Sequence, residues 1–250
     1  MNIDFNGHTV LVTGASRGIG AAIAMAFEAA GASLLLTGTN QNEIDELNQR
    51  NAQQGKQHVR WLQADFSSAA STTSFLEVIA QYPPIHVLIN NAGTNRISLI
   101  DEVSAEDLDM LLSVNLRAPL LLCKSVSRAM KQMHYGRIVN IASIWSVVTK
   151  PGRVVYSATK SGLAGMTRSV AVDLAPYGIL VNALSPGFVN TELTNTTLSE
   201  EERECIAGQV PLGRFAEPEE IARMVLFLSS KMNSYLTGQN IVVDGGFACV

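Results

Sequence analysis

Short runs of Val, Ile and Leu alternate with longer amphipathic segments along the whole chain, and this alternation limits the fold more than any other feature. Runs that are apolar throughout are typical of parallel strands covered on both faces. The segments between them are long enough for crossover helices. The alternation therefore predicts βαβ units that combine, through right-handed crossovers, into a doubly wound parallel sheet flanked by helices.

Seven of these runs are predicted strands, and some of the helices predicted between them begin with capping signals. The strands are Thr9–Thr13, Ser33–Thr37, Val59–Ala64, Val87–Asn90, Arg137–Ala142, Ile179–Leu184 and Asn240–Val243. The helices include Gly20–Ala30, Ala69–Gln81, Ser104–Met133, Ser157–Ala175, Ser199–Gly208 and Pro218–Ser229. Ser199 and Glu202, for example, have the spacing of a capping box. Because no repeat or low-complexity linker divides the chain, residues 1–250 are expected to form one α/β domain.

Composition narrows the class of protein. Hydrophobic residues make up 47% of the chain and charged residues 16%, which favours a large buried core over disorder. The net charge of −4 gives no electrostatic reason to expect a nucleic acid or an anionic membrane as partner. The three cysteines lack CxxC spacing and the four histidines are scattered, so neither a disulfide framework nor a metal site is expected. The N-terminus lacks a signal-peptide pattern and no long apolar window occurs, which favours a cytoplasmic protein.

The segment VLVTGASRGIG places Gly14, Gly18 and Gly20 directly after the first predicted strand. Glycines at such a place permit a tight turn and a close approach of the backbone to a phosphate, while the following helix N-terminus favours an anion. As a bare string the pattern is also compatible with an ordinary turn. Its position after a strand and before a helix predicts a nucleotide-binding loop.

This glycine spacing differs from GxGxxG, and TGASRGIG resembles the short-chain dehydrogenase/reductase family. The resemblance continues in the family's order with NNAG at Asn90–Gly93, Ser143, YSATK from Tyr156 to Lys160, and PGFVNT at Pro186–Thr191. It implies a single-domain Rossmann-type fold with a seven-stranded sheet. It also implies an enzyme that interconverts a ketone and a secondary alcohol with a nicotinamide cofactor. The branch that the chain resembles most is the 3-oxoacyl-[acyl-carrier-protein] reductases.

Charge near the end of the second predicted strand bears on the choice of cofactor. Folds that prefer NAD carry an acidic residue there for the ribose 2′-hydroxyl. This chain has LTGTN, with Gly38 at that place and Thr39 beside it. Arg17 resembles the family's basic residue that pairs with a 2′-phosphate, although it could also be a solvated loop charge. NADP(H) is therefore the expected cofactor, with NAD(H) still open.

The resemblance also assigns residues to cofactor binding. They are Gly14, Ser16, Arg17, Gly18, Ile19, Gly20, Thr39, Asp65, Asn91, Tyr156, Lys160, Val189 and Thr191. Asp65 would contact the adenine and could also cap a helix, and Asn91 would approach the adenine ribose. Val189 and Thr191 would hold the nicotinamide carboxamide.

Tyr156 and Lys160 stand four residues apart and so share one face of a helix. Hydride transfer to a ketone creates an alkoxide that must be protonated, and a free tyrosine has a pKa roughly three units too high for that task at neutral pH. A lysine ammonium one turn away favours the phenolate. The spacing therefore predicts that Tyr156 is the acid and that Lys160 lowers its pKa, although such a pair, taken alone, is usually surface decoration.

The remaining catalytic assignments come from the resemblance. Ser143 would donate to the substrate oxygen, Lys160 would also bind the nicotinamide ribose, and the main-chain carbonyl of Asn115 would hold a water that relays protons. Pro119 has no N–H, which leaves that carbonyl without its usual helical donor. No metal ligand is among the predicted site residues.

The substrate is expected to be a small carbonyl or alcohol compound, either linked to a carrier protein or free. The family's substrate lid corresponds to residues from about 191 to 214. Trp145, Val147, Val148 and Arg153 are candidate pocket residues, and Arg153 could meet a carboxylate or be solvated. The branch's carrier-docking arginines match His134 and Tyr177 here, so carrier recognition stays open. A polyol, sugar acid or small ketone is the alternative, and a catalytically silent nucleotide sensor is a remote one.

Small residues fill the predicted helix Ser157–Ala175 on more than one face. They permit close helix packing, and by resemblance this helix and Ser104–Met133 form contacts between subunits. A homotetramer is expected, with a dimer as the alternative.

Overall fold

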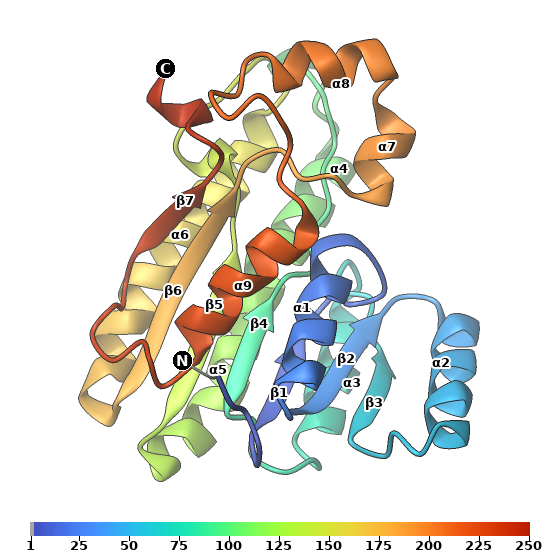
Figure 1. The fold of residues 1–250 in the computed structure, drawn as a ribbon, viewed down its shortest axis with the longest axis vertical. Helices are drawn as coiled ribbons and strands as arrows, with labels where there is room; N and C mark the ends of the chain where they lie inside the picture. The colour runs from blue at the N-terminus through green and yellow to red at the C-terminus, as the bar shows by residue number, and fades with distance from the viewer. Residues whose placement is uncertain (1–2) are drawn as a thin grey trace.

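Seven strands form one sheet in which every strand is parallel to its neighbours (Figure 1). The structure is a computed structural model that describes residues 3–250, except for the side chains of residues 193, 195 and 197. The strands are β1 (Thr9–Val12), β2 (Ser33–Gly38), β3 (Val59–Gln63), β4 (Val87–Asn90), β5 (Gly136–Ile141), β6 (Ile179–Pro186) and β7 (Asn240–Val243). Their order is β3-β2-β1-β4-β5-β6-β7. The order reverses direction between β1 and β4, and ligands bind beyond the carboxyl ends of the strands at such a point.

Helices cover both faces of the sheet (Figure 1). They are α1 (Gly18–Ala29), α2 (Gln41–Gln53), α3 (Ala69–Ile79), α4 (Ala105–Leu112), α5 (Ala118–Met133), α6 (Val154–Leu174), α7 (Glu192–Thr197), α8 (Glu200–Ala207) and α9 (Pro218–Ser229). One core joins Phe27 of α1 and Val225 of α9 to Val12 of β1. A second core, on the other face, joins Phe75 of α3 and Met130 of α5 to its strands. No helix within residues 3–250 is long and apolar enough to cross a membrane.

The predicted fold class is confirmed, and the main addition is helix α2. All seven predicted strands occur, β4 and β7 with the predicted bounds. Helix α2 was not predicted because its sequence, QNEIDELNQRNAQ, buries only Ile44. Polar side chains hold it instead: the Asn40 side chain accepts from the backbone N–H groups at its start, and Asn48 exchanges two hydrogen bonds with the backbone of Trp61.

The predicted helix Ser104–Met133 is not continuous. A π-helical turn, Ser113–Arg117, separates α4 from α5, and within it the N–H of Ala118 donates to the carbonyl of Ser113. Pro119 cannot donate to the carbonyl of Asn115, so the regular α-helical ladder cannot pass this point. The turn carries Asn115, which is fully buried.

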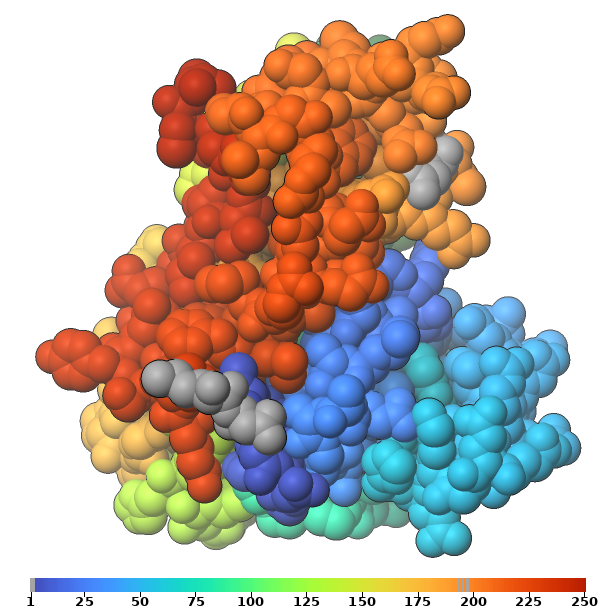
Figure 2. All heavy atoms as spheres, viewed as in Figure 1, coloured from blue at the N-terminus to red at the C-terminus, as the bar shows by residue number. Residues whose placement is uncertain are grey.

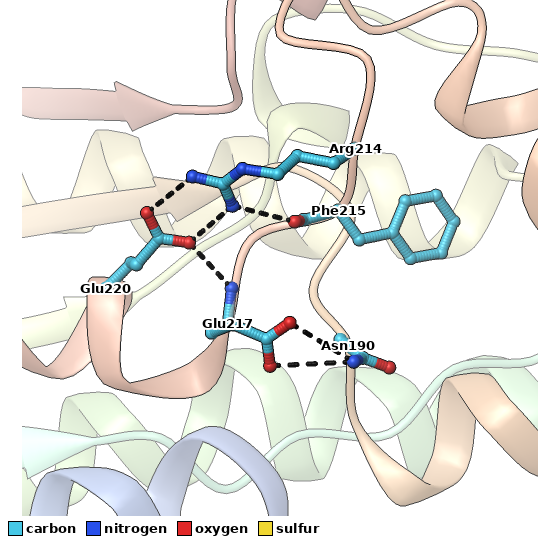
Figure 3. A network of polar contacts seen from close by, with 5 residues as sticks. All are labelled: Asn190, Arg214, Phe215, Glu217 and Glu220. Atoms are coloured by element: carbon cyan, nitrogen blue, oxygen red, sulfur yellow. Dashed lines mark hydrogen bonds and ion pairs between the residues drawn. The ribbon is translucent and has the colours of Figure 1, made fainter.

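The segment between β6 and α9 stands beyond the carboxyl ends of the strands and contains α7 and α8 (Figures 1 and 2). At its far end, Arg214 donates two hydrogen bonds of 2.6 and 2.8 Å to Glu220, and this pairing lowers the pKa of Glu220 to about 2. At its near end, the amide of Asn190 donates to Glu217 over 3.2 Å. Figure 3 shows both contacts at the start of α9. Both ends of the segment are therefore fixed to the same helix terminus.

Candidate active site

The glycine loop lies between β1 and α1, and a steric constraint favours glycine over any other residue at each of its three glycine positions. Gly14 and Gly18 have φ angles of 63° and 54°, in the region that favours glycine. A Cβ on Gly20 would overlap the carbonyl oxygen of Gly14 and lie 2.5 Å from the amide nitrogen of Asn91. Ile19 packs partly into the core beside the loop. The loop can thus fold over the start of α1 only with glycine at these places.

Side chains from three strand ends hold the loop in place. The amide of Asn91 donates to the carbonyls of Thr13 and Gly14, both over 2.9 Å. The Thr13 hydroxyl accepts from the N–H groups of Asn91 and Ala92, and the N–H of Gly14 donates to the Thr37 hydroxyl over 3.0 Å. Asn91 was predicted to approach the adenine ribose. The structure shows its side-chain amide nitrogen holding the glycine loop.

The end of β2 meets the glycine loop without an acidic residue. Arg17 is the N-cap residue of α1 and is exposed, and no ion pair involves it among the described residues. A Cβ on Gly38 would lie 3.8 Å from the Cβ of Ser16, so the end of β2 and the loop are close together. Ser16 and Thr39 are both exposed. This corner offers a free guanidinium and two hydroxyls to an anion.

Asp65, at the end of β3, is half-buried and was assigned either to adenine contact or to a helix cap. Its carboxylate accepts from the N–H and the hydroxyl of Ser67, over 2.9 and 2.6 Å. The cap of α3 is Ser68, whose hydroxyl accepts from the N–H of Ser71. The helix-cap alternative for Asp65 is therefore wrong, because Ser68 fills that role.

The segment that follows β6 comes back against the glycine loop. Val189 is buried, and its carbonyl accepts from the N–H of Thr191 and the hydroxyl of Thr194, each over 2.9 Å. Thr191 is the N-cap residue of α7, and a Cβ on Gly18 would lie 3.3 Å from its methyl group. Two of the predicted cofactor segments, far apart in sequence, are therefore neighbours.

Ser143, Tyr156 and Lys160 meet at the carboxyl end of β5. Ser143 follows this strand and begins the 3-10 turn Ile144–Ser146, and its hydroxyl is hydrogen-bonded to that of Tyr156. Tyr156 lies in the first turn of α6, because this helix begins at Val154 and not at the predicted Ser157. Lys160 is 3% exposed, and its ammonium donates to the carbonyl of Ile141 over 2.8 Å and lies 5.6 Å from the centre of the Tyr156 ring.

The charge balance at Tyr156 differs from the predicted one. Burial raises the pKa of Tyr156, while the hydrogen bond from Ser143 and the charge of Arg153 act against this rise. Burial also lowers the pKa of Lys160 to about 8. The charge of Arg153 thus adds a lowering effect on the pKa of Tyr156 that the sequence did not signal. The predicted effect of Lys160, whose nitrogen lies 5.6 Å from the centre of the Tyr156 ring, stays a prediction.

Asn115 reaches the same cluster from the π-helical turn. Its amide donates to the carbonyl of Thr94 over 2.8 Å and to the Thr159 hydroxyl over 3.2 Å, and its oxygen accepts from the N–H of Thr94. A Cβ on Gly93 would lie 3.4 Å from both the Asn115 oxygen and the Lys160 nitrogen. The side chain of Asn115 therefore helps fix the loop after β4 beside Lys160.

Comparison with known proteins identifies this arrangement. The family described as Enoyl-(Acyl carrier protein) reductase matches residues 14–248. A curated 3-oxoacyl-[acyl-carrier-protein] reductase, FabG, of Aquifex aeolicus is 40% identical over 98% of this chain and 99% of its own length. The chain belongs to the short-chain dehydrogenase/reductase family. It is therefore an oxidoreductase.

Two further relatives of this short-chain dehydrogenase/reductase differ in what their names say they act on. The FabG of Escherichia coli K12 is 38% identical over 99% of this chain and 100% of its own length. The solved structure of a gluconate 5-dehydrogenase from Burkholderia cenocepacia, in complex with NADP and tartrate, is 29% identical. It superposes with a TM-score of 0.91, covering 100% of this chain and 98% of that one. The fold and family are thus shared by reductases of acyl chains and by a dehydrogenase of a sugar acid.

The oxidoreductase's site also contains a residue that sequence reasoning missed. Lys150 lies over the ring of Trp145, with its nitrogen 5.6 Å from the ring centre, and Arg153 lies over the same ring at 5.7 Å. Trp145 also packs edge-on against Phe188 and Phe247. No spacing in the sequence signals this contact, because Lys150 reaches the ring only through the turn that precedes α6.

Proposed function

We propose that this short-chain dehydrogenase/reductase interconverts a ketone and a secondary alcohol with NADP(H). The observation that supports this is the cluster of Ser143, Tyr156 and Lys160 at the carboxyl end of β5, beside the glycine loop. The bound nicotinamide would supply or accept the hydride. The chain's own residues would supply the proton and hold the reacting oxygen.

Tyr156 would give its proton to the substrate oxygen in reduction and take it back in oxidation. Ser143, already hydrogen-bonded to that hydroxyl, would donate to the same oxygen and stabilise its developing charge. Lys160 would bind the nicotinamide ribose, and Asn115 would hold the relay water with its carbonyl. The other cofactor contacts proposed are those of the glycine loop, Thr39, Asp65, Asn91, Val189 and Thr191.

The NADP preference is proposed from the corner formed by Arg17, Ser16 and Thr39, which lacks an acidic residue, and from the NADP bound in the Burkholderia relative. An Arg17→Ala variant is expected to raise the KM for NADPH about 10- to 100-fold, because a charge-assisted contact to the 2′-phosphate is lost. The KM for NADH should change little. Steady-state kinetics with both cofactors test this, and equal losses for both would contradict the assignment. Arg17 is exposed, so folding should be unaffected.

The first substrate candidate is a 3-oxoacyl thioester. It is supported by relatives named 3-oxoacyl-[acyl-carrier-protein] reductase that match over nearly the full chain. Docking of a carrier protein is less well supported. His134 and Tyr177 have rings 6.4 Å apart, and they precede β5 and β6 at the sheet edge opposite Ser143.

The second candidate is a polyol, a sugar acid or a small ketone. It is favoured by the cations over Trp145 and by the gluconate 5-dehydrogenase that shares the fold. The test is NADPH and NADH oxidation against 3-oxoacyl thioesters, keto sugar acids and small ketones. Turnover of none of these, in either direction, would contradict the proposed function.

Two structural proposals accompany the activity. Residues from about 191 to 214, with α7 and α8, would form the lid over the substrate, since Thr191 contacts the glycine loop and both ends are fixed to α9. A homotetramer is proposed because exposed apolar side chains lie on α4, α5 and α6, namely Leu108, Leu112, Leu120 and Val172. A cytoplasmic location agrees with three cysteines that are all unpaired.

A further inference from the structure

Two cations stand side by side at the substrate end of the site. Lys150 and Arg153 both lie over the ring of Trp145, at 5.6 and 5.7 Å from its centre. Burial lowers the pKa of Lys150, and the charge of Arg153 lowers it further. The two positive charges therefore repel each other in a partly desolvated place.

Arg153 has no anionic partner among the residues that the structure describes. The ion pairs among the described residues involve Lys56, His58, Arg96 and Arg214, and none involves Arg153 or Lys150. The Nε of Arg153 is buried without a hydrogen-bond partner. Arg153 as a whole is partly buried, and a buried N–H that is left without an acceptor is unfavourable unless a ligand supplies one.

Arg153 is also close to the reacting atoms. It is the N-cap residue of α6 and precedes Tyr156, in the first turn of this helix, by three residues. The positive charge of Arg153 acts directly on the Tyr156 hydroxyl. An anion bound by Arg153 would thus lie within a few bonds of the carbonyl that Tyr156 protonates.

We infer that the substrate is a compact keto acid or hydroxy acid whose free carboxylate is bound by Arg153, with Lys150 adding positive charge. This rests on the proposed oxidoreductase function and chooses between its substrate classes. The planar guanidinium matches the two oxygens of a carboxylate. The rings of Trp145 and Phe188 contact the carbon atoms. A 3-oxoacyl thioester carries an uncharged thioester in place of the carboxylate. Such a substrate would leave Arg153 without a partner.

Measurements of ligand binding can test the inference without relying on turnover. Tartrate and threitol have the same carbon chain, but only tartrate carries carboxylates. Calorimetric titration of the NADP⁺-loaded protein should show tartrate binding more tightly than threitol. An Arg153→Gln variant should raise the Kd for tartrate at least about tenfold, Arg153→Lys should raise it less, and Lys231→Gln, which removes a distant exposed cation, should not raise it. Equal binding of tartrate and threitol, or no effect of Arg153→Gln, would overturn the inference.

Turnover measurements distinguish recognition of the substrate carboxylate by Arg153 from an effect of Arg153 on Tyr156. Acetoacetate and its methyl ester differ in the free carboxylate, as do gluconate and sorbitol. The ratio of kcat/KM for the acid to that for the neutral compound should fall about 10- to 100-fold in Arg153→Gln, mainly through KM. An equal fall for both members of a pair would mean that Arg153 acts only through Tyr156, and the inference would be wrong. If the wild type turns over neither these compounds nor 3-oxoacyl thioesters and small ketones, while Arg153→Gln still weakens tartrate binding, the proposed function fails and the carboxylate site stands.

Discussion

Turnover is expected to fall about 10²- to 10⁴-fold when Tyr156 is changed to Phe, the range that a positioned general acid contributes. The phenol is the only group hydrogen-bonded to Ser143 that can protonate the substrate oxygen among the described residues. The ring remains in Phe, so packing at the start of α6 should persist. NADPH affinity, measured by fluorescence titration, should stay within about threefold of the wild type, and the loss should appear in kcat.

The pH dependence of the wild type gives an independent check on the same group. Burial raises the pKa of Tyr156, so the phenol stays protonated through neutral pH. Ketone reduction, which consumes this proton, should be constant up to about pH 8. Alcohol oxidation, which needs the phenolate, should rise up to about tenfold per pH unit over the same range. A Tyr156→Phe variant with near-normal turnover, or oxidation that is flat with pH, would contradict the assignment.

Changing Gly20 to Ala should weaken both the fold and cofactor binding. The added methyl group would overlap the carbonyl oxygen of Gly14 and press on the amide of Asn91, which holds the loop. We expect a loss of about 1–3 kcal/mol in the free energy of unfolding, as for overpacked sites, and at least a tenfold rise in the Kd for NADPH. Denaturant unfolding and fluorescence titration measure the two effects.

Gly208 provides the matched control for this variant. It ends α8 with a φ of −62°, and a Cβ there would approach nothing closer than 3.5 Å. Gly208→Ala should therefore leave stability and NADPH binding nearly unchanged. If Gly20→Ala behaved like Gly208→Ala, the packing of the glycine loop described above would be wrong.

The fold was largely predictable because most of its strands are continuous apolar runs. β4, which is buried at every residue, and β7, a partly exposed strand at the sheet edge, both have the predicted bounds. Helix α2 was missed because polar contacts to Trp61 hold it in place of an apolar stripe. The break before α5 lies next to Pro119, which was expected to bend the helix, but no pattern in the sequence predicted the π-helical turn Ser113–Arg117.

The candidate site was predictable in its residues but not in its charges. Ser143, Tyr156 and Lys160 come together as their order in the sequence predicts. Arg153 also lowers the pKa of Tyr156, and no pattern in the sequence predicted this contribution, because it depends on where a long side chain points. Spacing along a helix determines which side chains share a face, but it does not determine which charges outside the helix act on the phenol.

The fixed ends of the segment between β6 and α9 have a consequence for redesign. Asn190 and Arg214 are both tied to the first turn of α9, and that turn belongs to the core that also holds β1 and α1. The polypeptide between these two anchors can therefore be exchanged for that of another family member without reshaping the sheet edge where hydride and proton are transferred. Such a graft would change the residues that select the substrate and would leave the residues that transfer the proton unchanged.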